Sequence, residues 1–248
     1  AFDAHNVDAS DSARGLAFSG LHGGLDWSAG ATRPATTLGW SSLDIYAIAN
    51  GAAAAHLQTH NGVLQLQQPL RVPVLGGQLL VSSLDWDPAA ASGERLQASL
   101  AVTGVDMGAL SRAFGWPEFK GTLAGAVPGL RYSDDRFLLD GGLSLNVFGG
   151  FVNVTRMSLQ QPFGPTPVLA ADINLQQLDL AAITQVFDFG SITGTLHGSV
   201  DDLRLVDWSP VAFKARLLAD QGGRISQRAV NNLTSVGGGG VAGGPCIV

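Results

Sequence analysis

Charged residues are scarce in this sequence. Its 248 residues include 14 basic and 20 acidic side chains, so the net charge is −6 and the charged fraction is 14%. Soluble domains usually contain about 25% charged residues. Proteins that bind nucleic acid need a positive field around the phosphates. The acidic balance therefore argues against nucleic acid as a partner.

Cysteine and metal ligands are also scarce. Cys246 is the only cysteine, so no disulfide can form within the chain. The five histidines are scattered, and although His56 and His60 are four residues apart, no third ligand accompanies them. The glycines of residues 238–243 match a dinucleotide-binding spacing, but no expected strand precedes them and no expected helix follows. We therefore expect no metal site and no cofactor.

The acidic residues form no catalytic constellation. Asp134-Asp135 and Asp201-Asp202 are adjacent pairs, and each pair follows an expected strand. Adjacent residues of a strand point to opposite faces, so we interpret both pairs as hairpin turns and not as paired catalytic carboxylates. We expect no enzymatic activity.

Long apolar runs are missing as well. The nearly uninterrupted apolar stretch at residues 178–187 reaches about ten residues, short of the ~18 to 20 that span a bilayer. The sequence begins without methionine, and it shows no signal-peptide pattern. We expect a piece of a longer protein, with any export signal or membrane anchor outside this sequence.

The sequence is rich in apolar residues, at 46%, and in glycine, with 33 residues, and part of it is duplicated. A shift of 73 residues (149 − 76) aligns residues 76–125 with residues 149–198 without a gap. The aligned positions keep glycines and apolar residues and change most others, so the repeat preserves a shape and an apolar face. The resulting divisions are the end of an upstream repeat and an irregular insertion (1–62), a first clear β repeat (63–135), a second β repeat and its continuation (136–220), a C-terminal helix (221–236) and a flexible glycine-rich tail (237–248).

Alternating apolar residues predict half-buried strands from Val63 onward. Glycine-bounded segments at 136–142 and 143–150 are expected to be two consecutive strands, whereas residues 51–62 mix helix formers with turn residues. Helical spacing follows Asp106, a predicted N-cap, and Ser226 is predicted to cap the C-terminal helix.

These elements predict a mainly β fold. We expect an elongated, twisted and curved antiparallel sheet that forms an open apolar groove. It would be built from repeats of about 73 residues, each with a short helix, plus a C-terminal helix. A self-packed core is the ordinary alternative for such alternation; the repeats and the low charge favour the groove.

An apolar groove suits a lipid cargo. Burying one methylene is worth about 0.8 kcal/mol, so holding a ~16-carbon acyl chain in water instead of hydrocarbon costs on the order of 10 kcal/mol. We predict that inward strand residues contact acyl chains, namely Leu79, Val81, Leu100, Val102, Leu123, Val127, Leu143, Leu145, Val147, Val152, Val154, Ile173, Leu175, Leu196, Val200, Leu203 and Leu205.

The chain resembles a known family over about residues 120 to 240, including the unit at 149–183. The run from Phe189 to Gly239 is similar to the C-terminal region of the YdbH branch of AsmA-like proteins of Gram-negative bacteria. The resemblance rests on a phenylalanine-glycine strand start, a Gly-x-Leu-x-Gly-x-Val strand, a Leu-x-Leu strand, an Ala-Phe pair and a Gly-Arg-Ile-Ser-Gln helix start, found here at 189–190, 194–200, 203–205, 212–213 and 223–227.

The resemblance implies a function in lipid transport. It implies a periplasmic protein, anchored to the inner membrane in its full length, with a long β-groove that passes phospholipids between the inner and outer membranes. The implied partners are phospholipid acyl chains and the two membranes, reached through missing termini or partner proteins, and a homodimer is one way to close the groove. The alternative function is a structural or adhesive β-repeat protein with a self-packed core and no lipid cargo.

Overall fold

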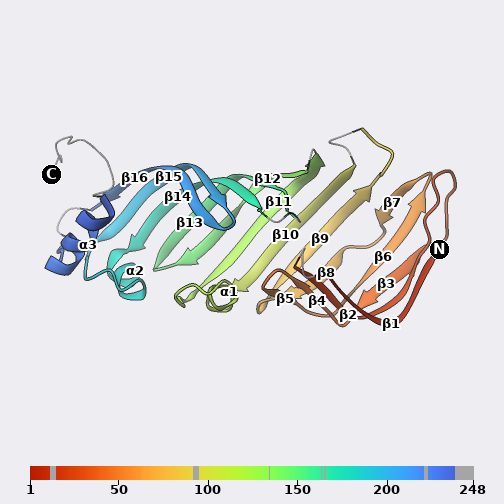
Figure 1. Cartoon of the computed structure of the whole chain (residues 1–248), viewed down its shortest axis with the longest axis horizontal. Coiled ribbons are helices and arrows are strands. Elements are labelled where there is room, and N and C mark those ends of the chain that lie inside the picture. The colour runs from red at the N-terminus through yellow and green to blue at the C-terminus, as the bar shows by residue number, and fades with distance from the viewer. Residues whose placement is uncertain are drawn as a thin grey trace.

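The computed structural model describes residues 1–11, 15–91, 95–133, 135–162, 164, 166–220 and 223–237. Within these ranges, sixteen strands pair into one large antiparallel sheet, and three helices accompany it (Figure 1). The strands follow one another along the long axis of the molecule. The prediction of a mainly β, antiparallel fold is confirmed.

Short strands precede long ones. The first group is β1 (Phe2–Asp11), β2 (Leu16–Leu25), β3 (Thr36–Trp40), β4 (Ser42–Ile45), β5 (Ile48–Asn50), β6 (Ala53–His60), β7 (Val63–Leu66) and β8 (Leu70–Val74). The second group is β9 (Gly77–Trp86), β10 (Leu96–Asp106), β11 (Gly121–Ser133), β12 (Arg136–Val147), β13 (Gly150–Gln160), β14 (Val168–Asp179), β15 (Thr195–Val206) and β16 (Ser209–Ala219). The helices are α1 (Met107–Ala113), α2 (Leu180–Val186) and α3 (Gln227–Gly237).

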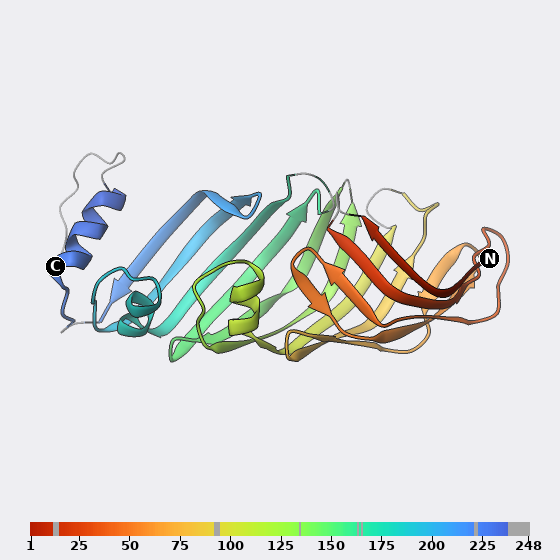
Figure 2. The ribbon, with the colours of Figure 1, turned by 60° about the horizontal axis from the view of Figure 1, so that its bottom comes forward.

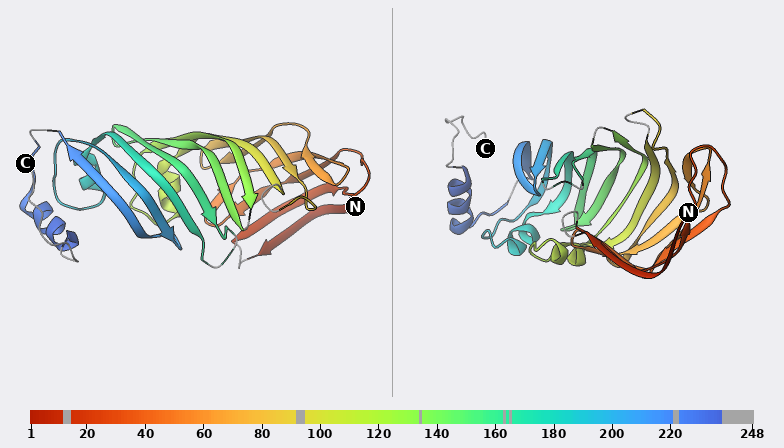
Figure 3. Two further views of the ribbon diagram at one scale, coloured as in Figure 1. Left: turned by 90° about the horizontal axis from the view of Figure 1, so that it is seen from above. Right: turned by 45° about the vertical axis from the view of Figure 1, so that its right-hand side comes forward.

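Strands β2 to β9 close into a ring, and β1 pairs with β2 outside it. β8 pairs with both β5 and β9, so the path β9-β7-β6-β3-β2-β4-β5-β8 returns to β9. Figure 3 shows these strands curling round at the N-terminal end. Buried side chains from strands around the ring, including Trp40, Leu57, Leu64 and Val72, form a common core. This end of the molecule therefore has a self-packed interior.

Residues 53–60 form a strand, although alanine and glutamine favour helices in isolation. Ala55, Leu57 and Thr59 are buried at alternate positions of β6. The Thr59 hydroxyl also donates a hydrogen bond of 2.8 Å to the carbonyl oxygen of Asp26. Burial with period two inside the ring thus overrides the local helix preference.

From β9 to β16 each strand pairs with the next, and bulges bend several of them. Gly141 in β12, Arg156 in β13 and Asp202 in β15 have positive φ angles of 123°, 49° and 52° at shifts of the pairing register. Bulges bend a strand and increase its twist. Because β12 and β13 are neighbouring strands and β15 lies close to them in the sheet, these bulges bend the sheet in the same region.

Two sequence predictions fail at these bulges. The glycine-bounded segments at 136–150 were expected to be two strands, but β12 is one strand that continues through Gly141. Asp201-Asp202 was expected in a hairpin turn, but both residues lie inside β15. A bulge and a tight turn both demand left-handed backbone, so sequence alone does not separate them.

The segments that lead into α1 and α2 have the same backbone features, namely an aspartate N-cap and a left-handed bulge residue before it. Asp106 accepts a hydrogen bond of 2.6 Å from the amide of Ala109 at the start of α1, which confirms the predicted N-cap. Asp179 caps α2 in the same way. Both helices have seven residues, and each is preceded by a left-handed bulge residue, Gly104 or Gln177.

The C-terminal helix α3 is held against the loop before β15. Ser226 accepts a hydrogen bond of 3.2 Å from the amide of Ala229, as predicted for a cap. Arg228 forms an ion pair of 2.7 Å with Asp188, and Ala229 is fully buried. Among the described residues, no helix is long and apolar enough to cross a membrane.

Candidate functional site

The candidate site is one face of β9 to β16, called here the apolar face. Directly paired residues of antiparallel strands point to the same side of a sheet, and the pairing places all seventeen predicted contact residues on this face. One row crosses the sheet through Leu79, Val102, Gly125, Leu143, Val154, Ile173, Val200 and Ala215. A parallel row passes through Val105, Leu123, Leu145, Val152, Leu175, Gly198 and Leu217.

Most side chains of the apolar face are only half buried. Val127 and Val147 are 1% and 3% exposed, and the other fifteen predicted residues have intermediate exposure. Two clusters on this face, around Met107 and around Met157, gather ten of the seventeen. A closed core would bury these rows completely. The apolar face is therefore packed within its plane and left partly uncovered.

The opposite face of the same strands carries a row of polar side chains. Its central row runs through Ser144, Asn153, Asn174, Ser199 and Arg216, each paired with the next. Strands with one apolar and one polar face are expected to have one side in water. The contrast identifies the apolar face as the side that needs a cover or a ligand.

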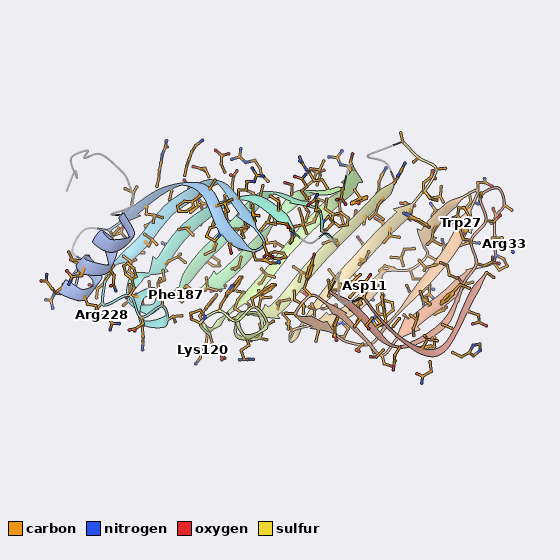
Figure 4. The ribbon with its side chains drawn as sticks, viewed as in Figure 1. Asp11, Trp27, Arg33, Lys120, Phe187 and Arg228 are labelled. Carbon is orange, nitrogen blue, oxygen red and sulfur yellow. The ribbon has the colours of Figure 1, made fainter. Side chains whose placement is uncertain are left out.

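Two helices cover one margin of the apolar face, called here the helix margin. Figure 2 shows α1 and α2 in front of the sheet near the ends of the strands. Beside α2, Phe119, Phe148 and Phe187 have ring centroids 5.1 to 6.4 Å apart. Lys120 and Phe187 lie at this margin (Figure 4).

An open depression of about 880 Å³ lies at the helix margin. It is lined by the start of β11, the β12–β13 turn and α2, including Phe119, Lys120, Val147 and Gln185. Its lining combines apolar side chains with polar and charged ones, which suits an amphiphile.

The opposite margin, called here the turn margin, carries the turns that follow β9, β11, β13 and β15. A depression of about 380 Å³ lies there, lined by Trp86, Leu96, Tyr132 and Phe137 together with Arg95. A hydrogen bond to the Asp135 carboxylate, reinforced by burial, raises the pKa of Tyr132. The phenol therefore remains neutral and donates.

A charged network fixes the bulge of β15. The backbone amide of Asp202 donates a hydrogen bond of 2.9 Å to Asp172, which is paired with Arg156. The Lys214 amine donates 2.8 Å to the Asp202 carboxylate. This hydrogen bond and the lysine charge lower the pKa of Asp202, and the same contact raises the pKa of Lys214. Both groups are therefore charged at neutral pH.

Three aromatic residues that are distant in sequence meet across the molecule. The Trp208 ring, in the β15–β16 turn, lies 5.8 Å from the Phe114 ring at the end of α1 and 5.8 Å from the Tyr46 ring in the β4–β5 turn. Phe114 stacks on Trp116 at 5.1 Å. Sequence reasoning gave these residues no functional role, because no local pattern links positions so far apart.

Sequence reasoning also missed part of the apolar face. Leu130, Leu139 and Met157 pair in one row, and the first two pack against Val127, Met157 and Ala171. A register shift between Ala126 and Gly129 precedes Leu130, and the bulge at Arg156 precedes Met157, so counting every second residue along β11 or β13 places these two side chains on the wrong side. A left-handed residue such as Arg156 marks the shift, but only the pairing register shows on which side of the sheet the residues beyond it lie.

The remaining candidates are not brought together into a reactive site. His56 and His60 lie on β6 and bind threonine hydroxyls, at 2.9 Å from Thr37 and 2.7 Å from Thr32. In the described part of the chain, no three His, Cys, Asp or Glu side chains are grouped to hold a metal ion. Cys246 and the glycines of 238–243 lie outside the described residues.

Comparison with known proteins assigns no family. No family model matches the chain, and no curated protein or solved structure matches it significantly. The resemblance to AsmA-like proteins therefore stays a prediction.

Proposed function

We propose that this protein is a non-enzymatic conduit that shields phospholipid acyl chains on its apolar face during transport between two membranes. The observation that carries the proposal is the half-buried state of fifteen apolar side chains in continuous rows across β9 to β15. Rows of half-exposed Leu and Val offer hydrocarbon contact without a fixed polar anchor. A lipid that slides along them meets similar contacts at each strand.

The length of the apolar face fits this role. The row from Leu79 in β9 to Ala215 in β16 crosses eight strands, and at about 4.8 Å between neighbouring strands it is about 34 Å long. A ~16-carbon acyl chain is shorter than that. Complete burial of such a chain would offset a cost on the order of 10 kcal/mol in water.

The proposal includes a groove built from repeated units of about 73 residues. Its support is that α1 and α2, their caps at Asp106 and Asp179, and the bulges at Gly104 and Gln177 are separated by that interval. Gly77 and Gly150 support it further, because a Cβ atom at either would meet backbone atoms at the bulge of the next strand. Each unit would then contribute bent strands and one helix at the helix margin.

We propose further that the chain is a C-terminal piece of a YdbH-type AsmA-like protein in the periplasm of a Gram-negative bacterium. The full-length protein would be anchored to the inner membrane. Support comes from the motifs at 189–227, which occupy the loop before β15, the strands β15 and β16, and the start of α3. A homodimer that covers the apolar face belongs to the same proposal.

Site-specific photo-crosslinking tests the conduit. A photo-reactive amino acid at Leu145, Val154 or Leu175 is expected to form lipid adducts in cells. Asn153 is the matched control, because it is next to Val154 in β13 and on the polar face. Equal labelling at Asn153 and its neighbour would reject lipid contact on the apolar face.

One observation favours a structural or adhesive role. Every residue of β16 is exposed, including Val211, Phe213, Leu217 and Leu218. An exposed strand edge with apolar residues invites pairing with another chain. Mass spectrometry of the purified protein separates the two roles, because a conduit retains phospholipid and a purely adhesive sheet does not.

A further inference from the structure

The hairpin formed by β15 and β16 bends over the apolar face. Trp208 belongs to the turn margin, whereas Phe114 belongs to the helix margin, yet their rings are 5.8 Å apart. β15 and β10 are separated by four intervening strands, so in a flat sheet they would be about 24 Å apart. The strands from β10 to β15 therefore do not form a flat sheet, and the β15–β16 hairpin bends toward the helix margin. Figure 1 shows the β15–β16 turn in front of the sheet.

The bend is located at the bulge of β15. The register of β15 shifts against both neighbours between residues 200 and 204, where Asp202 has a φ of 52°. Beyond this point, residues 203–212 form the hairpin tip. Leu203 and Leu205 lie on its inner side, because they pair with Ala171 and Leu169. The tip therefore presents apolar side chains to the space that it covers.

Trp208 occupies an unfavourable backbone position. Asp207 and Trp208 both have positive φ, at 49° and 60°, as in a type I′ hairpin turn, whose second residue is preferentially glycine. The turns β8–β9 and β12–β13 do have glycine there, at Gly76 and Gly149. A bulky residue in this conformation is strained and persists only where its surroundings hold it. The ring contacts supply such surroundings.

Tyr46 completes the contact from the closed ring of strands. Its ring is 5.8 Å from the ring of Trp208, in an edge-to-face arrangement. Its hydroxyl oxygen is buried and has no hydrogen-bond partner among the described residues. A buried, unpaired hydroxyl regains hydrogen bonds to water when its cover moves away. When the contact opens, the Tyr46 hydroxyl can therefore bind water, and the backbone strain at Trp208 can relax.

We propose that the hairpin tip is a releasable cover over the apolar face, and that Trp208 is the latch that holds it closed against Phe114 and Tyr46. Closure keeps an acyl chain on the face, and opening admits or releases one sideways. The favourable ring contacts and the opposing backbone strain are of similar size, so neither state dominates by a large factor. This inference rests on the proposed function for its cargo, but the motion of the tip is measurable without lipid.

Spin labels measure the latch directly. Cys246→Ser removes the only cysteine, and Ala47→Cys and Ser209→Cys place labels at exposed positions beside Tyr46 and Trp208. With Trp208 present we expect a substantial short-distance population beside a longer one. Trp208→Ala is expected to remove the short-distance population, and Trp208→Phe is expected largely to retain it. An unchanged distribution in Trp208→Ala would overturn the latch.

A control pair shows that the sheet itself is intact. Labels at Ala47 and Thr122 do not include the hairpin tip, since Thr122 is the second residue of β11. Their distance is expected to be the same with Trp208 and with Trp208→Ala. A change in this pair would mean that the substitution disturbs the whole fold, and would overturn the assignment of Trp208 as a local latch.

Lipid exchange tests what the cover does. A short thiol crosslinker between Ala47→Cys and Ser209→Cys locks the tip, and vesicles of phosphatidylethanolamine and phosphatidylglycerol supply an acyl-labelled fluorescent phospholipid. We expect at least about tenfold slower exchange in the locked protein than in the uncrosslinked double variant. Equal exchange would overturn the cover, whereas no lipid uptake by either form would overturn the proposed function itself.

Discussion

The substitution Val154→Asp separates a lipid-contacting face from a closed core. Val154 lies in the middle of a cross-strand row, paired with Leu143 and Ile173, and is half buried. Its removal sacrifices only part of the ~1.5 to 3 kcal/mol that a fully buried valine contributes. Because the new carboxylate remains in contact with water, we expect a loss of unfolding free energy of about 1 kcal/mol.

The expected loss of lipid-binding free energy is larger than this loss of stability. An acyl chain that crosses the rows meets a new strand about every 4.8 Å, which is the length of about four methylenes. If the carboxylate displaces about three methylenes, the loss at about 0.8 kcal/mol each is about 2.4 kcal/mol. That corresponds to about a 50-fold weaker affinity. The lipid retained per protein, measured by mass spectrometry, is expected to fall accordingly.

Two variants make this prediction refutable. Val127→Asp introduces a charge where only 1% of the residue is exposed, so it is expected to cost about 3 to 5 kcal/mol of stability. Asn153→Asp changes the polar face and should alter neither stability nor lipid content. If denaturant unfolding shows the same large loss for Val154→Asp as for Val127→Asp, the face is a closed core and the groove is rejected. Unchanged lipid content in a folded Val154→Asp protein refutes the lipid contact.

Three further measurements test the fold. Asp106→Ala and Asp179→Ala are each expected to cost about 1 kcal/mol in denaturant unfolding, because each removes an N-cap; no loss at either position would contradict the capping. Gly150→Ala is expected to cost more than about 1 kcal/mol, because its Cβ would meet backbone of the next strand, whereas Gly30→Ala, with open space around it, should be neutral. Burial raises the pKa of Tyr46 above its ordinary value of 10.0, so the stability that its neutral phenol contributes is full below pH 10 and is lost as the pH rises through the higher pKa. Tyr46→Phe should abolish that part of the alkaline loss, and identical pH profiles would contradict it.

Alternation in the sequence was sufficient to predict the faces of most strands. Residues such as Leu143, Leu145, Val152 and Val154 follow period two without interruption, so their common side follows from strand geometry alone. The alternation becomes ambiguous at a bulge, where one extra residue shifts the side of everything beyond it. Met157 lies beyond such a bulge and was missed for that reason.

The contacts between distant segments that close the ring and hold the hairpin tip could not be predicted from the sequence. The pairing of Asn50 with Val74 closes the ring, and the contact of Trp208 with Tyr46 joins segments more than 150 residues apart. Neither depends on a local propensity. Both depend on how twist and bends accumulate over many strands, which no single stretch of sequence specifies.

The closed ring and the apolar face differ in how completely they bury their apolar side chains. Strands of both parts have an apolar side, but around the ring Trp40, Leu57 and Leu64 meet partners from other strands and are buried. From β11 to β15 the same kind of side chain packs against neighbours in its rows and, at one margin, against α1 and α2, and most of these side chains remain half buried. If the proposed conduit function holds, a lipid that moves along the face toward the N-terminal end reaches a filled interior at β9. On that proposal the lipid would leave sideways across a margin, and the aromatic contacts of Trp208 and Phe187 lie at the margins.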